Sequence, residues 1–292
     1  MKVNLFIAGA CKSGTTYLHD FLSQQEDVFG ASPKEPYFFE LPERLRDEDS
    51  YHSKYFTAYN NQKYKLDSRH RNMFFSWIPK VLHDYNSNAK LIFILRNPVD
   101  RAFSHWWMWY SRGVIKTSFM KSIGNEIKFI NKNGSFMNIS PETYYSFVQE
   151  KSYQNRMAYA DASTILESGY YYEQIKEFKK YFNSENILIL DFKQLSNKTE
   201  LISALSTFLN IKISNFESDD NKNQAKKHKK TSSFIASYIP KSIKLKLKNM
   251  FLTKPEITKK ANIMLQQYYK SHNEKLIDEF ELHFVKEWQK NK

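Results

Sequence analysis

The chain has 292 residues, 41% of them hydrophobic and 26% charged, and a formal net charge of +13. These values exclude a disordered chain, and a single cysteine, Cys11, excludes an internal disulfide. No apolar run approaches the roughly 20 residues that span a bilayer, so we expect no transmembrane helix. The charge is concentrated, because residues 221–260 contain twelve lysines and one acid and the rest of the chain carries only +2.

The first ten residues, MKVNLFIAGA, place an apolar patch after Lys2. This patch is shorter than the apolar region of a secretory signal peptide, about 7 to 15 residues, and it runs directly into a glycine loop as a buried strand would. The single cysteine also fits a reducing compartment. We therefore expect a cytoplasmic protein, and the basic segment leaves peripheral attachment to a membrane open.

The first elements along the chain are a strand, a glycine loop and a helix. Residues 2–8 (KVNLFIA) are apolar with β-branched members, as in a strand that is covered on both faces. Residues 15–25 then carry apolar side chains at helical spacing. Residues 90–95 (KLIFIL) predict another buried strand. Directly after it, Asn97-Pro98 supplies an N-cap and a first-turn proline for the next helix.

The later elements continue the alternation of strands and helices. They are a helix from Asn97-Pro98 to about Ser111, helices at 171–182, 200–209 and 255–280, and a strand at 186–191. Residues 113–160 are only weakly periodic, and we expect helices and loops there that cover the active-site side. This alternation predicts an α/β fold with three layers, α/β/α, around a central parallel sheet. No break in composition divides the chain, so we expect one domain over 1–292, with 221–260 as a basic loop or insertion.

Residues 8–22, AGACKSGTTYLHDFL, carry the first chemical motif. Gly9 and Gly14 keep the G-x-x-x-x-G spacing of an NTPase loop, but the lysine comes before the second glycine. A glycine loop between a strand and a helix points backbone N–H groups at one spot, where the helix N-terminus adds partial positive charge. The loop's further donors are Lys12, Ser13, Thr15 and Thr16. An ordinary strand-to-helix turn is the simpler interpretation, yet this context favours a site for a phosphate-like anion.

The second motif is LIFILRNPVDRAFSH, in which Arg96 follows a buried strand. Ligands of open α/β sheets bind at that edge, and arginine suits bidentate binding of phosphate. Ser104 lies about two turns into the following helix, at a spacing that faces the same ligand. An ion pair between Arg96 and Asp100 is the structural alternative.

Together these two stretches resemble the PAPS-dependent sulfotransferases, PAPS being 3′-phosphoadenosine 5′-phosphosulfate. The first looks like their 5′-phosphosulfate loop and the second like their 3′-phosphate motif. The likeness is to the heparan-sulfate or carbohydrate type and its bacterial relatives, and not to the phenol-sulfating type. Residues 33–40, PKEPYFFE, look like the stretch that carries the catalytic glutamate of this branch.

The resemblance implies a P-loop-nucleotide-hydrolase-like fold and transfer of a sulfuryl group from PAPS to a hydroxyl or amine, leaving PAP, adenosine 3′,5′-bisphosphate. The acceptor it implies is a carbohydrate, a glycolipid or another glycoconjugate, and no metal is required. The implied 5′-phosphosulfate ligands are Lys12, Ser13, Gly14, Thr15 and Thr16. The implied 3′-phosphate ligands are Arg96 and Ser104, and Lys12 also stabilises the charge that develops on the leaving group.

Glu35 is the catalytic base that the resemblance implies, although from the sequence alone a surface ion pair with Lys34 is the simpler role. His70 is a weaker alternative base. Where relatives have an acidic residue and a lysine, this chain has Asp67 and Ser68. Arg69 or Arg71 then supplies the missing cation.

The lysine-rich segment 221–260 has three interpretations. Lys226 and Lys227, with Lys229 and Lys230 as further candidates, cover the nucleotide; residues 239–251 contact an anionic membrane or an acidic glycan; or the segment is a solvated surface loop. The residues also leave two other functions open. One is a small-molecule kinase using ATP and Mg²⁺ with Asp191, and the other is a basic protein that binds nucleic acid, a partner that the resemblance does not lead us to expect.

Overall fold

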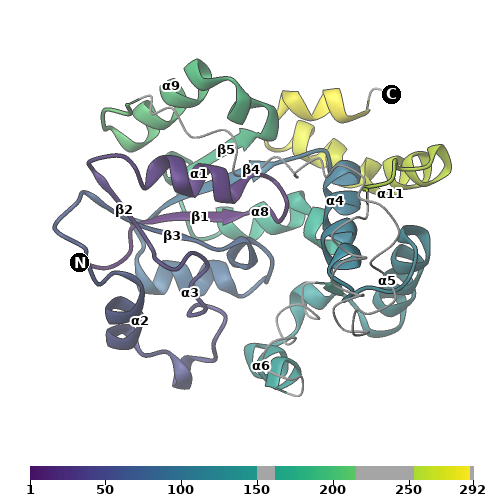
Figure 1. Ribbon diagram of the computed structural model, residues 1–292, viewed down its shortest axis with the longest axis horizontal. Coiled ribbons are helices and arrows are strands. Elements are labelled where there is room, and N and C mark those ends of the chain that lie inside the picture. Colours follow the sequence, from purple (N-terminus) through teal and green to yellow (C-terminus); the bar gives the residue numbers. More distant parts are fainter. Residues whose placement is uncertain (150–161, 215–252, 290–292) are drawn as a thin grey trace, which may run out of the picture.

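The structure is a computed structural model that describes residues 1–149, 162–214 and 253–289 (Figure 1). Its centre is a five-stranded sheet in the order β2-β3-β1-β4-β5, and every neighbouring pair is parallel. The strands are β1 (Leu5–Gly9), β2 (Val28–Gly30), β3 (Tyr64–Ser68), β4 (Lys90–Leu95) and β5 (Ile187–Asp191). The predicted parallel α/β sheet is therefore confirmed.

β1 lies in the middle of the sheet and pairs on its two sides with β3 and β4, aligning Leu5 with Leu66 and Ile7 with Ile92. All five residues of β1 are buried, as expected for an apolar strand that is covered on both faces. Because the sheet is parallel, the carboxyl ends of all five strands meet at one edge, which carries the residues described below.

The helices form a layer on each face of the sheet. Those described are α1 (Thr15–Leu22), α2 (Glu48–Tyr55), α3 (Ile78–Tyr85), α4 (Pro98–Ser111), α5 (Phe119–Asn133), α6 (Pro141–Gln149), α8 (Tyr171–Lys179), α9 (Lys198–Leu209) and α11 (Lys259–Asp278). One apolar cluster joins α1 and α9 to one face through Leu18 and Leu205. A larger cluster joins α3 and α8 to the other face through Leu82 and Phe178, so the three-layer prediction is confirmed (Figure 1).

Local sequence signals explain where two of the helices begin. At α4 the Asn97 side chain accepts a hydrogen bond of 2.9 Å from the Val99 N–H, and Pro98 occupies the first turn, as predicted. At α11 the prediction of a start at residue 255 was wrong. Thr258 is extended and its hydroxyl caps the Ala261 N–H at 3.3 Å, so that helix begins at Lys259.

Helices α4 and α5 lie toward the right of the view in Figure 1, and α6 lies at its bottom. Helices α5 and α6 confirm helices in the weakly periodic range 113–160, of which 150–160 lies outside the described residues. Within the described ranges, no helix combines the length and the apolar character that crossing a membrane requires.

Candidate active site

The glycine loop joins β1 to α1 and is shaped by Gly14. This residue has a φ of 86° in the left-handed region and occupies the N-cap position of α1. A Cβ atom there would lie 2.4 Å from Leu195 Cδ1, so both the conformation and the packing require glycine. The first N–H groups of α1 lack intrahelical acceptors, and they are available to an anion in the loop.

Arg96 lies against this loop. Its Nη1 donates a hydrogen bond of 3.2 Å to the carbonyl of Lys12, a residue 84 positions away in the chain. The Tyr171 hydroxyl donates to the Arg96 carbonyl at 2.9 Å, and Ser13 is fully buried beside that tyrosine. The two motifs therefore form one site at the carboxyl ends of β1 and β4.

The Lys12 ammonium group points toward α4 and lies 3.5 Å from Met108 Sδ. Ser104 is half-buried on the same helix, one turn before Met108. Thr15 is buried at the start of α1, whereas Thr16 is exposed. Burial lowers the pKa of Arg96 even though the charge of Asp100 raises it, which indicates that this half-buried cation is incompletely neutralised.

A lysine that the sequence analysis did not single out joins these groups. Lys254 lies 5.2 Å from the ring centre of Phe103, the residue before Ser104. Burial lowers its pKa first, and the charges of Arg96 and Lys12 lower it further. Three cations thus converge here. Lys226 and Lys227, the predicted covering residues, lie outside the described residues.

Glu35 occupies a second corner of the site, with about one third of its side chain exposed (36%). One carboxylate oxygen is 2.9 Å from Lys34 Nζ, and the other is 3.6 Å from His70 Nδ1. Burial raises the pKa of Glu35, but His70, Lys34 and Arg69 together lower it below its usual range. The carboxylate is therefore ionised at neutral pH, and the two candidate bases are neighbours.

Buried side chains hold this corner in place. Arg69 donates to the Glu35 carbonyl at 3.2 Å and forms an ion pair with Glu40, which is fully buried. The Tyr144 hydroxyl of α6 donates to the other oxygen of Glu40 at 2.7 Å. Arg71 lies instead over aromatic rings, including that of Phe74. Arg69 thus already forms an ion pair with a buried acid, Glu40.

Asp67 and Ser68, where relatives have an acid and a lysine, also have local partners. The Tyr51 hydroxyl donates to Asp67 at 2.6 Å, and burial raises the pKa of Asp67 to about 7. Ser68 Oγ lies 2.8 Å from His19 Nδ1. The charge of Lys34 lowers the pKa values of both His19 and Asp67, so this lysine, and not only the two arginines considered from the sequence, supplies positive charge there.

Comparison with known proteins places this geometry in a family. The family model described as "Sulfotransferase domain" matches residues 2–287. The chain belongs to the sulfotransferase family.

Two relatives illustrate the sequence similarity. Human bifunctional heparan sulfate N-deacetylase/N-sulfotransferase 2 is 26% identical over 212 residues, covering 70% of this chain and 22% of that protein. The membrane-associated sulfotransferase kil1 of Dictyostelium discoideum is 23% identical over 265 residues, covering 71% of this chain and 56% of that protein. The sulfotransferase chain thus spans about a fifth and about half of the lengths of these relatives.

Two solved structures share the fold. A sulfotransferase from Alicyclobacillus acidocaldarius superimposes with a TM-score of 0.66 at 20% identity, over 95% of both chains. Mouse sulfotransferase SULT7A1, solved in complex with PAP, gives a TM-score of 0.52 at 13% identity, over 99% of this chain and 88% of the mouse chain. These likenesses support the P-loop-like α/β fold.

Proposed function

We propose that this protein transfers the sulfuryl group of PAPS to a hydroxyl or amine of a carbohydrate or glycoconjugate. The observation that carries this proposal is the hydrogen bond between Arg96 and the Lys12 carbonyl. It brings together two cationic motifs that would hold the two ends of a doubly phosphorylated adenosine. The name of the heparan sulfate relative supports a glycan acceptor, and the PAP complex of the mouse neighbour supports the nucleotide.

In the proposed complex, the glycine loop holds the 5′-phosphosulfate. Lys12 and the N–H groups of α1 supply charge and donors, together with the hydroxyls of Ser13, Thr15 and Thr16. Arg96 and Ser104 hold the 3′-phosphate, with Lys254 as a further cation. Because Arg96 is half-buried and its pKa is lowered mainly by burial, a bound phosphate would relieve an existing electrostatic cost. Lys254 is exposed, but the charges of Arg96 and Lys12 also lower its pKa, so it would gain from the same anion.

The proposed reaction is an in-line displacement at sulfur. The acceptor oxygen or nitrogen forms the new bond to sulfur, and the bond from sulfur to the bridging oxygen of PAPS breaks, so that PAP leaves with the electron pair. Lys12 stabilises the negative charge that builds on that oxygen. The acceptor proton passes to a carboxylate within hydrogen-bond reach.

Glu35 is the base that we propose, because its carboxylate is ionised and partly exposed at the edge where the acceptor would enter. Its basicity is limited by Lys34 and His70. An acceptor that displaces one of these contacts would restore the ability of Glu35 to take a proton. His70, at 3.6 Å, then orients the carboxylate, and it stays the alternative base.

We further propose that residues 1–292 form one sulfotransferase domain in which 221–260 is a basic insertion. Lys254 belongs to the end of that segment and contacts the site, which supports a role for the segment in covering the nucleotide. Lys226 and Lys227 stay candidates for the same role.

The kinase alternative gains no support from Asp191. Its carboxylate accepts the Lys193 N–H at 3.2 Å and forms a capping box with Gln194 at the start of the turn 192–196. Asp191 therefore has a structural role in capping this turn, and this role does not require it to bind a metal ion. If the protein instead bound nucleic acid, the hydrogen bond between Arg96 and the glycine loop would have no specific role.

The test is calorimetric titration of the protein with PAP and with ATP, each with and without Mg²⁺, followed by transfer from labelled PAPS. We expect tight binding of PAP that does not depend on Mg²⁺. Binding of ATP that requires Mg²⁺, with no binding of PAP, would favour the kinase and overturn the proposal.

A further inference from the structure

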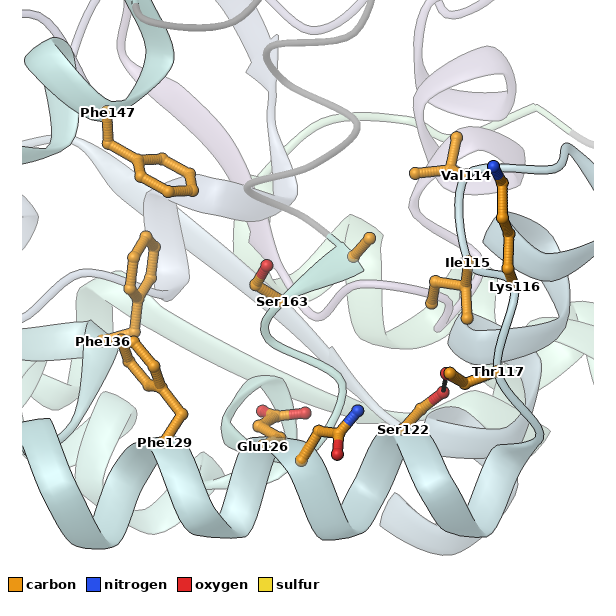
Figure 2. Close-up of a pocket in the computed structure, with 12 residues that line it drawn as sticks. Val114, Ile115, Lys116, Thr117, Ser122, Glu126, Phe129, Phe136, Phe147 and Ser163 are labelled. Carbon is orange, nitrogen blue, oxygen red and sulfur yellow. Dashed lines mark hydrogen bonds between the residues drawn. The ribbon is translucent and has the colours of Figure 1, made fainter.

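A cavity of about 350 Å³ lies beside α5, between the loop that follows α4 and helix α6 (Figure 2). Its volume falls at the lower end of the range of about 300 to 1,000 Å³ that is typical of small-molecule sites. None of its lining residues belongs to the glycine loop, to the group around Arg96 or to the corner around Glu35. The cavity is therefore available to another ligand.

The two sides of the cavity are apolar. Phe129, Phe136 and Phe147 form a continuous aromatic wall, with ring centres 6.5 Å and 5.7 Å apart in that order. Val114 and Ile115 lie on the opposite side, as Figure 2 shows. Such walls attract alkyl chains and aromatic rings through burial of apolar surface.

The polar groups at the base of the cavity already have partners within the protein. The hydroxyls of Thr117 and Ser122 bond each other at 2.7 Å. The Glu126 carboxylate accepts the backbone N–H groups of Leu166, at 2.9 Å, and Glu167, at 3.2 Å, and burial raises its pKa to about 7. A sugar ring placed here would find few partners for its hydroxyls, whereas an apolar group would leave these bonds intact.

Both sides of the cavity are connected to the candidate active site. On one side, the N–H groups of Val114 and Ile115 donate to the carbonyl of Trp109, which follows Met108, the residue that Lys12 contacts. On the other side, Phe147 lies one turn after Tyr144 on α6. The Tyr144 hydroxyl bonds Glu40, the partner of Arg69 beside Glu35. Each wall of the cavity is thus linked, through these contacts, to one of the two places proposed for the sulfuryl group and the base.

We propose that this cavity binds the apolar part of the acceptor, so that the acceptor is an amphiphile: a glycoside or similar alcohol or amine with an alkyl or aryl group. The inference rests on the proposed function, because it assigns the acceptor of that same site. Three polar residues, Lys116, Asn125 and Ser163, line the cavity at its exposed edge, where the polar part of such a molecule would begin.

The test compares octyl β-D-glucoside, below its critical micelle concentration, with methyl β-D-glucoside by calorimetric titration into the PAP-loaded protein. The two probes share the sugar and differ only in the chain. We expect the octyl compound to bind with a dissociation constant at least ten-fold lower. Equal constants for the two probes, or no binding of either, would overturn the proposal.

Two substitutions on α5 test whether octyl glucoside binds in the cavity. Asn125→Trp places a large ring at the cavity from an exposed position of α5, and we expect it to weaken binding of octyl glucoside at least ten-fold. Lys128→Trp introduces the same ring at an exposed position that does not line the cavity, and it should leave the constant unchanged. Equal effects of the two variants would contradict the assignment. If Asn125→Trp does not fold, Phe129→Ala, which truncates a ring that is 46% exposed, replaces it with the same expected weakening.

Titration with PAP in the same samples separates the two proposals. If PAP binds but the octyl chain adds nothing, the cavity proposal fails and the proposed function stands. If PAP does not bind, the proposed function fails, and the glucoside titrations, repeated without PAP, still decide whether the cavity takes an apolar group.

Discussion

The two corners of the candidate site are held in different ways. Around Lys12 and Arg96 the shape comes from backbone: a left-handed glycine, a helix N-terminus and a hydrogen bond to a loop carbonyl. Around Glu35 it comes from ionic and hydroxyl side chains, of which the pair of Arg69 with Glu40 is the most buried. We therefore expect the shape of the first corner to depend little on pH, whereas the second should respond both to pH and to changes of its ionic side chains.

The largest effect is expected from removing charge in the backbone-built corner. Lys12→Ala should lower turnover about 100- to 1,000-fold, the scale of one lost electrostatic contact to a developing charge. Transfer from labelled PAPS measures this, and an unchanged melting temperature would show that the loop keeps its shape. Lys193→Ala, which removes an exposed lysine after β5, is the control. Normal turnover in Lys12→Ala would remove its proposed role.

A substitution in the side-chain corner should lower turnover but leave binding of the nucleotide donor unchanged. Glu35→Gln should lower turnover about 100-fold, typical of a lost general base, and leave the affinity for PAP unchanged. Steady-state kinetics and titration with PAP measure the two quantities. His70→Ala should have a smaller effect on turnover, and a larger one would make His70 the base.

A substitution of Arg96 tests whether the backbone-built corner binds the nucleotide donor. Arg96→Ala should weaken PAP by about 2 to 3 kcal/mol, the scale of a hydrogen bond to a charged group. Titration with PAP measures this loss, with Arg112→Ala, an exposed arginine after α4, as the matched control. A PAP affinity equal to that of the unmodified protein would show that the 3′-phosphate lies elsewhere.

The dependence of the side-chain corner on pH can be measured at Asp67. Its pKa is raised to about 7 by burial, so the folded state keeps a proton that the unfolded state loses near pH 4. Stability should therefore fall as the pH rises from about 4 to about 7. Asp67→Asn should remove most of that fall, about 4 kcal/mol for a shift of about three pKa units, measured by denaturant unfolding. Asp20→Asn, on the exposed side of α1, is the control, and identical pH profiles of the Asp67 variant and the unmodified protein would contradict this account.

The smallest effect is expected at Lys254. Lys254→Ala should weaken PAP about five- to ten-fold, or about 1 kcal/mol, because this lysine adds charge to a phosphate that Arg96 already holds. Lys259→Ala, an exposed lysine at the start of α11, should change little. Equal PAP affinities for the two variants would exclude Lys254 from the donor site.

These contrasts explain what the sequence could predict. β1, β4 and α4 were predictable because strong local signals mark them: continuous apolar runs and the Asn97-Pro98 cap. The three residues of β2, Val28–Gly30, are too few to show a period. The pairing of Arg69 with Glu40 depends on tertiary packing, which no local pattern encodes.

The candidate site, like the fold, was predictable from the sequence only in part. The proximity of Lys12 and Arg96 was predictable, since a parallel sheet brings the ends of its strands to one edge. Lys254 was not, because nothing local distinguishes one lysine from the other eleven in its segment. The cavity beside α5 was also beyond prediction, as its walls come from weakly periodic residues whose partners only the fold defines.

The turn 192–196 after β5 touches both phosphate motifs. Leu195 occupies the space that a side chain on Gly14 would need, and the Phe192 ring lies 4.7 Å from the Arg96 guanidinium. In the proposed complex, these two apolar contacts would set the separation between the 5′- and 3′-phosphate positions. A nucleotide would then be selected by the distance between its two phosphate groups as well as by its charge, and a larger side chain at Leu195, which removes no hydrogen-bond donor, should alter that selection.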